Sequence, residues 1–243
     1  MTYDRPRFLA GGDKALFIEF GNAIAPKLGR RVQRLLLAIQ NTGIPGLVEA
    51  VPTYRSVLIH YDPLQISPKE LRDRLETLEQ RAEDSQFPKP RVVEVPTVYG
   101  SEYGPDLEFV AKHSGLTPEE VVQIHTSTAY LIYMLGFIPG FAYLGGMSSR
   151  IATPRLDTPR SRIPSGSVGI AGNQTGIYPA ESPGGWQLIG RTPLKLFDLH
   201  KEPPALLQAG NSVLFVRITL QEFTRIKEEV EQGTYEMKET PVA

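Results

Sequence analysis

The stretch GFIPGFAYLGG, residues 136–146, opens the part of the chain that decides its fold. Between Gly136 and Pro193 lie 11 of the 22 glycines and 7 of the 21 prolines, in less than a quarter of the 243 residues. Glycine and proline at this density keep strands short and place tight turns between them. The stretch therefore predicts a compact β-barrel or sandwich rather than a parallel sheet, with short strands such as 167–171 and 186–189.

Residues before position 85 follow a different pattern, in which strands and helices alternate. A hairpin is expected at 8–10 and 15–20, and further strands at 47–51 and 56–61. Val32, Leu35, Leu36 and Ile39 recur at the spacing of one helix face. A second helix follows the capping sequence SPKE, 67–70. The order ββαββα predicts a small α+β sandwich domain with its helices on one face of a sheet.

The charged segment 82–91 contains Pro88 and Pro90 and is the predicted linker. It divides the chain into an N-terminal domain, 1–88, and a barrel domain, 89–243. The second domain is expected to begin with a strand at 92–99 and two short helices. Strands at 128–135 and 212–218 follow, and then a helix capped by TLQE, 219–222, with Leu220 in its apolar register. The tail after Gly233 is expected to fray.

Composition excludes several classes of protein. The chain has 26 Lys and Arg against 27 Asp and Glu, so no strong positive field attracts nucleic acid. It has no cysteine, which excludes disulfides and thiolate chemistry and fits the cytoplasm. The first residues have no apolar run or small-residue cleavage site, so a secretion signal is not expected. Residues 126–149 carry no charge, yet their glycines and proline favour a buried strand and loop over a membrane span.

Aromatic rings separated by glycine and proline mark residues 136–146 as a candidate pocket wall or partner surface. A plain buried hairpin is the alternative, and composition leaves both open. Two further loops, 163–180 and 178–186, are nearly free of charge, and the second holds the single Trp. Such loops are expected to pack on each other, on a ligand or on another subunit. The candidate substrate-binding residues are Phe137, Gly140, Phe141, Tyr143, Gly166, Gln174, Tyr178, Gly185 and Trp186.

Arginines gather around the repeated TPR triplet at 153–155 and 158–160. Guanidinium groups suit carboxylate or phosphate, although a solvated surface is an equally good reading of these side chains. We take Arg155, Arg160 and Arg191 as candidate anion contacts in catalysis. Ser167, beside Gly166, is a fourth candidate, because a hydroxyl and nearby N–H groups can bind a carbonyl or carboxylate.

The sequence lacks a phosphate-binding P-loop, a dinucleotide-binding glycine motif and a hydrolase nucleophile motif. His60, His113, His125 and His200 do not have metal-ligand spacing, and no metal site is predicted. His125 is the strongest candidate among them for a functional role, because it ends a predicted helix just before the apolar strand that leads to residues 136–146. By itself the chain shows no self-sufficient catalytic centre.

Taken in order, these motifs resemble the KipI/PxpB family, also called the B subunit of 5-oxoprolinase, allophanate hydrolase subunit 1 or carboxyltransferase subdomain C. The resemblance runs along nearly the whole chain. It rests on GFxPGFxYLG (136–145), PR (154–155 and 159–160), PxGSV (164–168), QTGIYP (174–179) and SPGGW…IGRTP (182–193).

The resemblance implies a C-terminal cyclophilin-like β-barrel and a bacterial or archaeal cytoplasmic protein. It implies one subunit of an ATP-dependent 5-oxoprolinase that works with a KipA/PxpC-type subunit and a LamB/YcsF-type PxpA subunit. Without a nucleotide motif, ATP is expected at a composite site shared with a partner. Two alternatives stay open: a KipI-like inhibitor of a sensor histidine kinase, and a carboxyltransferase or allophanate hydrolase component. Neither a membrane nor a nucleic acid is an expected partner.

Overall fold

The computed structural model describes residues 1–82 and 90–241. The chain divides into two compact units, residues 1–88 and 89–243. Most of the predicted linker, including the expected boundary between positions 88 and 89, lies outside the described residues.

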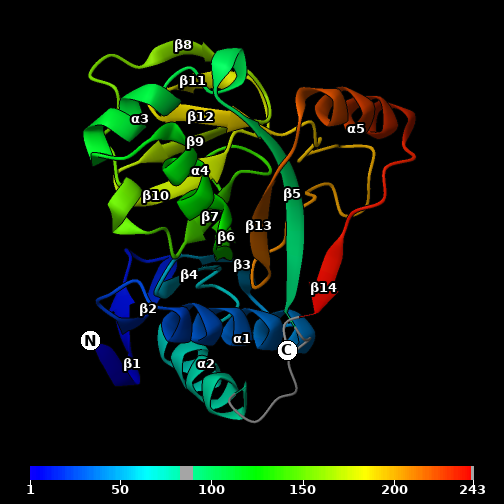
Figure 1. Cartoon of the computed structure of the whole chain (residues 1–243). Helices are drawn as coiled ribbons and strands as arrows, with labels where there is room; N and C mark the ends of the chain where they lie inside the picture. Colours follow the sequence, from blue (N-terminus) through cyan, green and yellow to red (C-terminus); the bar gives the residue numbers. More distant parts are fainter. Residues whose placement is uncertain (83–89, 242–243) are drawn as a thin grey trace. The chain divides into compact units, whose positions relative to one another are not determined.

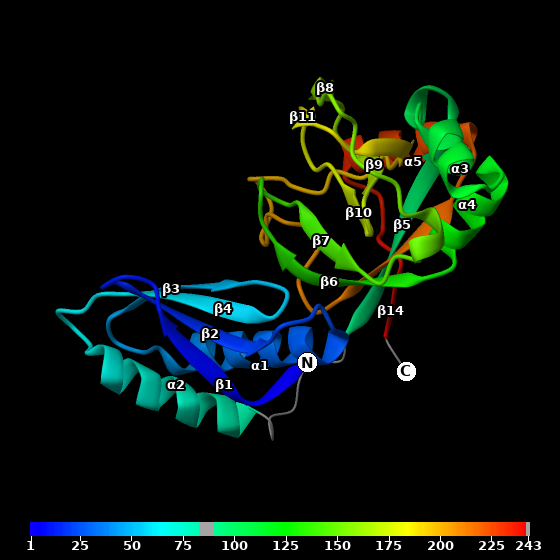
Figure 2. The ribbon, with the colours of Figure 1, turned by 90° about the vertical axis from the view of Figure 1, so that its left-hand side faces the viewer.

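The first unit has the predicted order ββαββα (Figure 1). Its four strands form an antiparallel sheet in the order β1-β2-β4-β3. Figure 2 shows both helices of this unit on the same face of the sheet. The elements are β1 (Thr2–Ala10), β2 (Ala15–Gly21), α1 (Pro26–Thr42), β3 (Leu47–Pro52), β4 (Ser56–Tyr61) and α2 (Pro68–Ala82).

The alternation of buried and more exposed residues along β4 explains why the helices pack on one face of the sheet. Val57, Ile59 and Tyr61 point into the core, where they meet the apolar stripe of α1. Gly43 ends α1 in the left-handed conformation (φ 61°), which a residue with a side chain rarely adopts. The alternation follows from the periodicity of the sequence, the end of α1 follows from its glycine, and the predicted fold of this region is confirmed.

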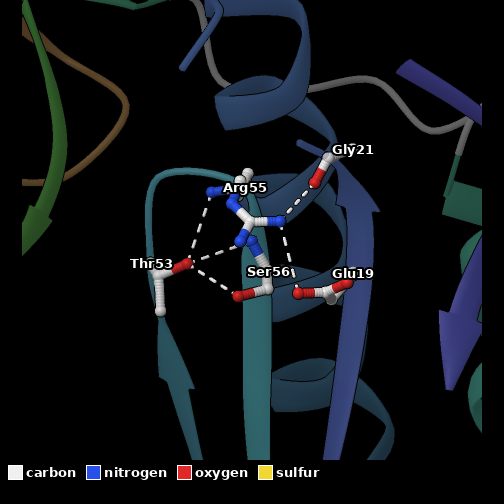
Figure 3. Close-up of polar contacts among 5 residues, drawn as sticks. All are labelled: Glu19, Gly21, Thr53, Arg55 and Ser56. Atoms are coloured by element: carbon white, nitrogen blue, oxygen red, sulfur yellow. Dashed lines mark hydrogen bonds and ion pairs between the residues drawn. The ribbon is translucent and has the colours of Figure 1, made fainter. Parts of the chain in front are cut away.

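A polar cluster fastens the turn between β3 and β4 to strand β2 (Figure 3). The Arg55 guanidinium donates to the carbonyl oxygen of Gly21 and, at 3.2 Å, to the Glu19 carboxylate. Thr53 Oγ1 accepts from the backbone N–H groups of Arg55 and Ser56. All the polar contacts drawn in Figure 3 join residues of this turn and strand, so we assign the cluster to the stability of the hairpin.

The second unit contains the predicted barrel. Its main sheet follows the order β10-β9-β12-β5-β13-β6-β7, with β14 paired to β5. The two ends of this order, β7 and β10, lie close together, so the sheet nearly closes on itself (Figure 1). The strands are β5 (Arg91–Tyr99), β6 (Ala129–Leu135), β7 (Ala142–Gly145), β9 (Ser167–Ala171), β10 (Gln174–Ile177), β12 (Gln187–Arg191), β13 (Ser212–Arg217) and β14 (Glu239–Pro241), and the separate pair is β8 (Arg160–Ile163) with β11 (Ser182–Gly184).

Helices and one parallel pairing complete this unit. The described helices are α3 (Leu107–Ser114), α4 (Pro118–Thr126) and α5 (Leu220–Gln232), with short 3-10 turns η1 (Ser101–Tyr103) and η2 (Ser149–Ile151). Reciprocal capping boxes at Thr117 and Thr219 start α4 and α5, and the second is the cap predicted from TLQE. Strands β5 and β13 run parallel, a pairing between distant segments that local pattern does not indicate.

Two expectations for the C-terminal segment are wrong. The tail after Gly233 does not fray along its length, because β14 pairs antiparallel with β5, and Tyr235 and Met237 pack against the core. Leu220 is 52% exposed and lies outside the buried face of α5, which Phe223 and Ile226 form. As the first helical residue after the cap, Leu220 precedes the turn that meets the core.

No helix in the described residues combines the length and the apolar character needed to cross a bilayer. The uncharged stretch 126–149 instead supplies β6 and β7, whose side chains include the buried Tyr130, Ile132 and Leu144.

Candidate functional site

Four of the predicted aromatic residues meet in one cluster. Phe141 lies at its centre, with its ring centroid 5.3 Å from Tyr143, 5.9 Å from Tyr178 and 5.7 Å from Trp186. The rings meet edge to face, which is the favoured geometry for such pairs. Phe141, Tyr178 and Trp186 are buried, so their rings fill space inside the unit rather than line an open wall.

Glycines let the aromatic cluster close. A Cβ on Gly184 would collide with the Tyr178 hydroxyl, and one on Gly176 would lie 3.1 Å from the Trp186 ring. Gly140, a predicted site residue, has φ 82°, and a Cβ there would lie 2.8 Å from that of Phe197. Gly185 differs, because a Cβ there would have no neighbouring atom closer than 3.6 Å.

Phe137 is the exposed member of the aromatic group. Its side chain is 65% exposed and its ring lies edge-on to Phe141, with centroids 5.6 Å apart. Its φ is 65°, and this backbone conformation is unfavourable for a residue with a bulky side chain. The predicted aromatic residues therefore do not form one continuous pocket wall. Three of the rings are buried, Tyr143 is half-exposed, and Phe137 is exposed.

Arg160 is bound within the protein. Its Nη2 lies 2.7 Å from Asp106 Oδ1, and Asp106 Oδ2 accepts from the N–H of Leu188 at 2.6 Å. Arg160 Nη1 also donates to the Trp186 carbonyl at 3.4 Å. This chain of contacts ties β8 to β12 and to the start of α3. Arg160 therefore acts as a brace beside the aromatic cluster.

The remaining predicted residues occupy separate positions. Arg155 is exposed on the loop before β8. Gln174 begins β10 and pairs across the turn with Ala171. Gly166 (φ 80°) lies so close to Thr192 that a Cβ would collide with the Thr192 carbonyl oxygen. Gly166 thereby brings the loop before β9 onto the end of β12, where Arg191 lies.

Arg191 and Ser167 lie directly opposite each other on two neighbouring strands. They are register partners in the β9–β12 pair, so their side chains share one face of the sheet. Ser167 is fully buried, and its Oγ has no hydrogen-bond partner among the described residues. The buried Nε of Arg191 also lacks a partner within that part of the chain. Buried polar groups are usually paired, so this pair on neighbouring strands is a candidate for binding a ligand.

A cavity of about 780 Å³, here called the Arg191 cavity, opens beside Arg191, while Ser167 is not one of the residues that line it. Loop residues after β12, the inner face of α5 and the segment before β14 form its walls. A volume of this size is typical of small-molecule sites. Its lining includes Tyr103, Ser165, Arg191, Lys195, Asp198, Lys201, Phe223, Lys227, Glu231 and Tyr235.

Tyr103 supports the Arg191 guanidinium, whose Cζ lies 5.3 Å from the centre of the tyrosine ring. The turn η1 that carries Tyr103 is fixed to β12 by Gly104, because a Cβ there would collide with the Ile189 carbonyl oxygen. Ser101, two residues before Tyr103, has φ 48°. A serine held in this conformation shows that the turn is constrained by its surroundings.

His125 is buried and fully bonded. Its Nδ1 lies 2.8 Å from the Tyr99 hydroxyl and its Nε2 lies 2.8 Å from Thr175 Oγ1. Thr175 Oγ1 also donates to the Gly169 carbonyl, so it accepts from Nε2–H, and Tyr99 donates to Nδ1. Burial lowers the pKa of His125 to about 3, which keeps the ring neutral. His125 is a structural residue, and its nitrogens are not available as a base.

Sequence reasoning did not find most of the Arg191 cavity. Tyr103, Lys201 and Phe223 come from a short turn, a loop and the last helix, and none of the three stands in a motif typical of a binding site. Arg191 is the predicted site residue that lines the cavity, and it stands in the IGRTP motif. The described residues contain no group of three or more His, Cys, Asp or Glu side chains suited to a metal ion.

The chain belongs to the carboxyltransferase domain family, subdomains C and D, whose family model matches residues 6–207. This confirms the resemblance drawn from the motifs. A Bacillus subtilis protein, named as the B subunit of 5-oxoprolinase, is 48% identical over 229 residues, which are 90% of this chain and 95% of that protein. A protein of the same name from Haemophilus influenzae is 51% identical, over 80% of this chain and 91% of its own length.

Longer proteins contain a similar region. The crystal structure of TTHA0988 superposes with a TM-score of 0.76 and 37% identity, over 85% of this chain and 40% of that one. The urea amidolyase of Lachancea kluyveri is 28% identical over 92% of this chain, which is 14% of its own length. The Kluyveromyces lactis urea carboxylase shares the fold, with a TM-score of 0.74 at 21% identity over 100% of this chain and 25% of that one.

Proposed function

We propose that this chain is one subunit of an ATP-dependent 5-oxoprolinase that works in the cytoplasm. The observation that carries the proposal is the 48% identity with a bacterial protein named as the B subunit of 5-oxoprolinase. The match covers 90% of this chain, so it is not confined to one of the two compact units. We further propose that the partners are a KipA/PxpC-type subunit and a LamB/YcsF-type PxpA subunit.

The chemistry explains why ATP is required. The amide of 5-oxoproline is unactivated, and phosphorylation of its oxygen makes that oxygen a leaving group. Water adds to the phosphorylated carbon and the ring C–N bond breaks, which leaves an acyl phosphate. A second water hydrolyses this acyl phosphate, so that glutamate, ADP and phosphate are formed from 5-oxoproline, ATP and two waters. Such a reaction needs cations for the phosphoryl group, donors for the developing oxyanion and a positioned base.

The residues of this chain can supply part of that set. Arg191 is a candidate contact for a carboxylate or phosphoryl group, and Ser167 offers a hydroxyl on the same face. Arg160 is engaged by Asp106 and acts as a positioning residue for β12. His125 has both nitrogens occupied, and the hydrogen bonds of the described residues give Ser167 no histidine or carboxylate partner. This supports a base, and a complete active site, contributed by another subunit.

The test is reconstitution. The chain is co-expressed with its two candidate partners, and phosphate release from ATP is measured with and without 5-oxoproline. We expect release that depends on 5-oxoproline and on all three chains. In the reconstituted complex, Arg191→Gln is expected to lower that rate at least about tenfold if the guanidinium stabilises charge in the transition state.

A matched control is Arg150→Gln, which removes an exposed arginine of η2 in the same unit and should leave the rate within about twofold. Release that does not depend on 5-oxoproline, from a confirmed and folded three-chain complex, would contradict the proposal. The regulator alternative makes a separate prediction, which is slower autophosphorylation of a histidine kinase on addition of this chain alone.

A carboxyltransferase component is the second candidate. The matched family model and the urea amidolyase region favour it. This function requires a carboxylated biotin as donor, so it predicts association with a biotinylated protein. A streptavidin blot of the purified complex tests that candidate directly.

A further inference from the structure

The Arg191 cavity carries an unbalanced positive charge. Four of its lining side chains are basic and two are acidic. Lys195 pairs with Asp198 at 2.9 Å, and Lys227 lies 3.9 Å from Glu231. Arg191 and Lys201 are then the two cations of the lining that have no acidic partner among the ion pairs of the described residues. A cavity with two uncompensated cations attracts a ligand of more than one negative charge.

The cavity also has an aromatic and apolar wall. Tyr103 and Phe223 lie with their ring centroids 5.0 Å apart, and Leu194, Leu206, Val230 and Met237 complete this side. The cations and the apolar wall belong to the same space, so a suitable ligand has a charged end and an apolar or planar body. Sites for such ligands combine a few placed polar groups with apolar walls.

Arg191 is held ready for an anion. Its guanidinium lies against the Tyr103 ring, which fixes its plane, while its buried Nε has no partner in the described part of the chain. An arginine fork forms its strongest bonds with carboxylate or phosphate, which it contacts through two N–H groups at once. The constrained turn at Ser101 and the close approach of Gly104 keep Tyr103 in place under the guanidinium. The geometry is thus prepared before any ligand arrives.

The proposed reaction has two anionic substrates, 5-oxoproline and ATP, which differ in size and charge. 5-Oxoproline is a small monoanion, and it would leave most of a cavity of about 780 Å³ unfilled. A nucleotide has a planar base for the aromatic wall and a phosphate chain for two cations. We propose that the Arg191 cavity binds the nucleotide, with Arg191 and Lys201 in contact with its phosphates. This inference rests on the proposed function. The chain by itself would then contain a nucleotide site, in place of the composite site that the sequence suggests.

The experiment is equilibrium binding to the purified full chain, measured by titration calorimetry. ATP, ADP, inorganic phosphate and 5-oxoproline are titrated separately. We expect ATP and ADP to bind, inorganic phosphate to bind more weakly and 5-oxoproline to bind least. Arg191→Gln should weaken ADP binding about tenfold or more, and Lys201→Gln about three- to tenfold. Added salt should weaken binding to the wild-type chain more than to either variant.

Two matched variants control for charge and for folding. Arg150→Gln and Lys112→Gln each remove one exposed positive charge elsewhere in the same unit, and ADP binding should stay within about twofold. Tyr103→Leu keeps the charge but removes the ring below the guanidinium, and it should weaken ADP binding several-fold. Thermal melting checks that every variant is folded. If Arg191→Gln does not fold, Arg191→Lys takes its place, because it keeps the charge and loses the fork.

Three results would overturn the proposal: no nucleotide binding by the chain alone, equal binding by Arg191→Gln and Arg150→Gln, or a loss confined to 5-oxoproline. The last result would make the cavity a carboxylate site instead. These outcomes are distinct from failure of the proposed function. Nucleotide binding that depends on Arg191, without 5-oxoproline-dependent phosphate release from the complex, would keep the cavity assignment and reject the reaction. Release without binding by this chain would do the reverse.

Discussion

The aromatic cluster and the Arg191 cavity both include residues from the Gly- and Pro-rich part of the chain, but one is closed and the other is open. Around Phe141 the rings fill the space between strands, and glycines remove the side chains that would keep them apart. Around Arg191 a space of about 780 Å³ remains, and two buried polar atoms nearby have no partner in the described residues. The aromatic cluster is thus filled by its own side chains, whereas the Arg191 cavity leaves both space and polar atoms without a partner in the described residues.

Residue type alone therefore does not distinguish a site from a core. Arg160 and Arg191 come from the same set of candidate arginines. Asp106 pairs with the first, whereas the second lies against a tyrosine ring and has no acidic partner among the described ion pairs. A side chain that is already satisfied stabilises the fold, while an unsatisfied one keeps its binding capacity for something else. Substitutions at Trp186, Asp106 and Arg191 test whether stability and binding divide between the two regions in this way.

The largest expected effect is in the aromatic cluster. Trp186→Ala removes a buried ring that contacts Phe141 and Tyr178, and we expect it to lower the free energy of unfolding by about 3–5 kcal/mol. Urea denaturation measures this change. Phe137→Ala is the control, since its ring is 65% exposed and should cost less than about 1 kcal/mol. Similar losses for both variants would show that the cluster is not the closed core described above.

The second effect concerns the brace beside the cluster. Asp106→Ala removes both the ion pair with Arg160 and the acceptor for the Leu188 N–H, and it leaves the guanidinium half-buried. We expect a loss of about 2–3 kcal/mol in the free energy of unfolding. Arg162→Gln breaks an ion pair with Glu181 whose side chains are 76% and 51% exposed, and it should cost no more than about 0.5 kcal/mol. If both variants cost the same, Asp106 is not a brace.

The sequence predicts the first unit well because burial there follows simple periods. The alternation of Val57, Ile59 and Tyr61, and the helical spacing from Val32 to Ile39, each report which face meets the core. Helix starts at Thr117 and Thr219 are equally local, because a capping box involves four consecutive residues.

The second unit is harder to predict because its pairings are distant. The parallel pair β5–β13 joins Val93 to Val213, and β14 pairs with β5 only after the chain has returned from α5. Local pattern therefore indicated a frayed tail where a strand forms. Motif residues such as Arg191 could be selected from sequence, but their partners could not. The closeness of Tyr103 depends on the absence of a side chain at Gly104, which no spacing rule reveals.

The third prediction concerns His125, which lies against the aromatic residues Tyr99, Tyr130 and Phe215. Its pKa falls from 6.5 to about 3 on folding because burial disfavours the charged ring. The unfolded chain therefore binds the extra proton below pH 6.5 while the folded chain does not. This contribution to stability is fully present above pH 6.5 and decreases as the pH falls toward 3, with a slope of at most about 1.4 kcal/mol per pH unit.

Unfolding free energies measured from pH 7 down to about pH 5 test this slope, since the unfolded carboxyl groups titrate mainly below that range. His125→Gln should flatten the curve relative to the wild type, whereas His113→Gln, on the exposed surface of α3, should leave it unchanged. A parallel decline in the wild type and in His125→Gln would mean that His125 is not the buried neutral group described here.

The smallest effect on stability is expected where the effect on binding is expected to be largest. Arg191→Gln removes a guanidinium that has no carboxylate partner among the described ion pairs and contacts the Tyr103 ring from one side. Losing this ring contact costs about 0.5–1 kcal/mol, and releasing a buried Nε that has no partner offsets part of it. We therefore expect urea denaturation to give a change within about 1 kcal/mol, in contrast to Trp186→Ala. A loss as large as that of Asp106→Ala would place Arg191 with Arg160 among the structural arginines, because only a side chain already satisfied by the protein leaves such a deficit when it is removed.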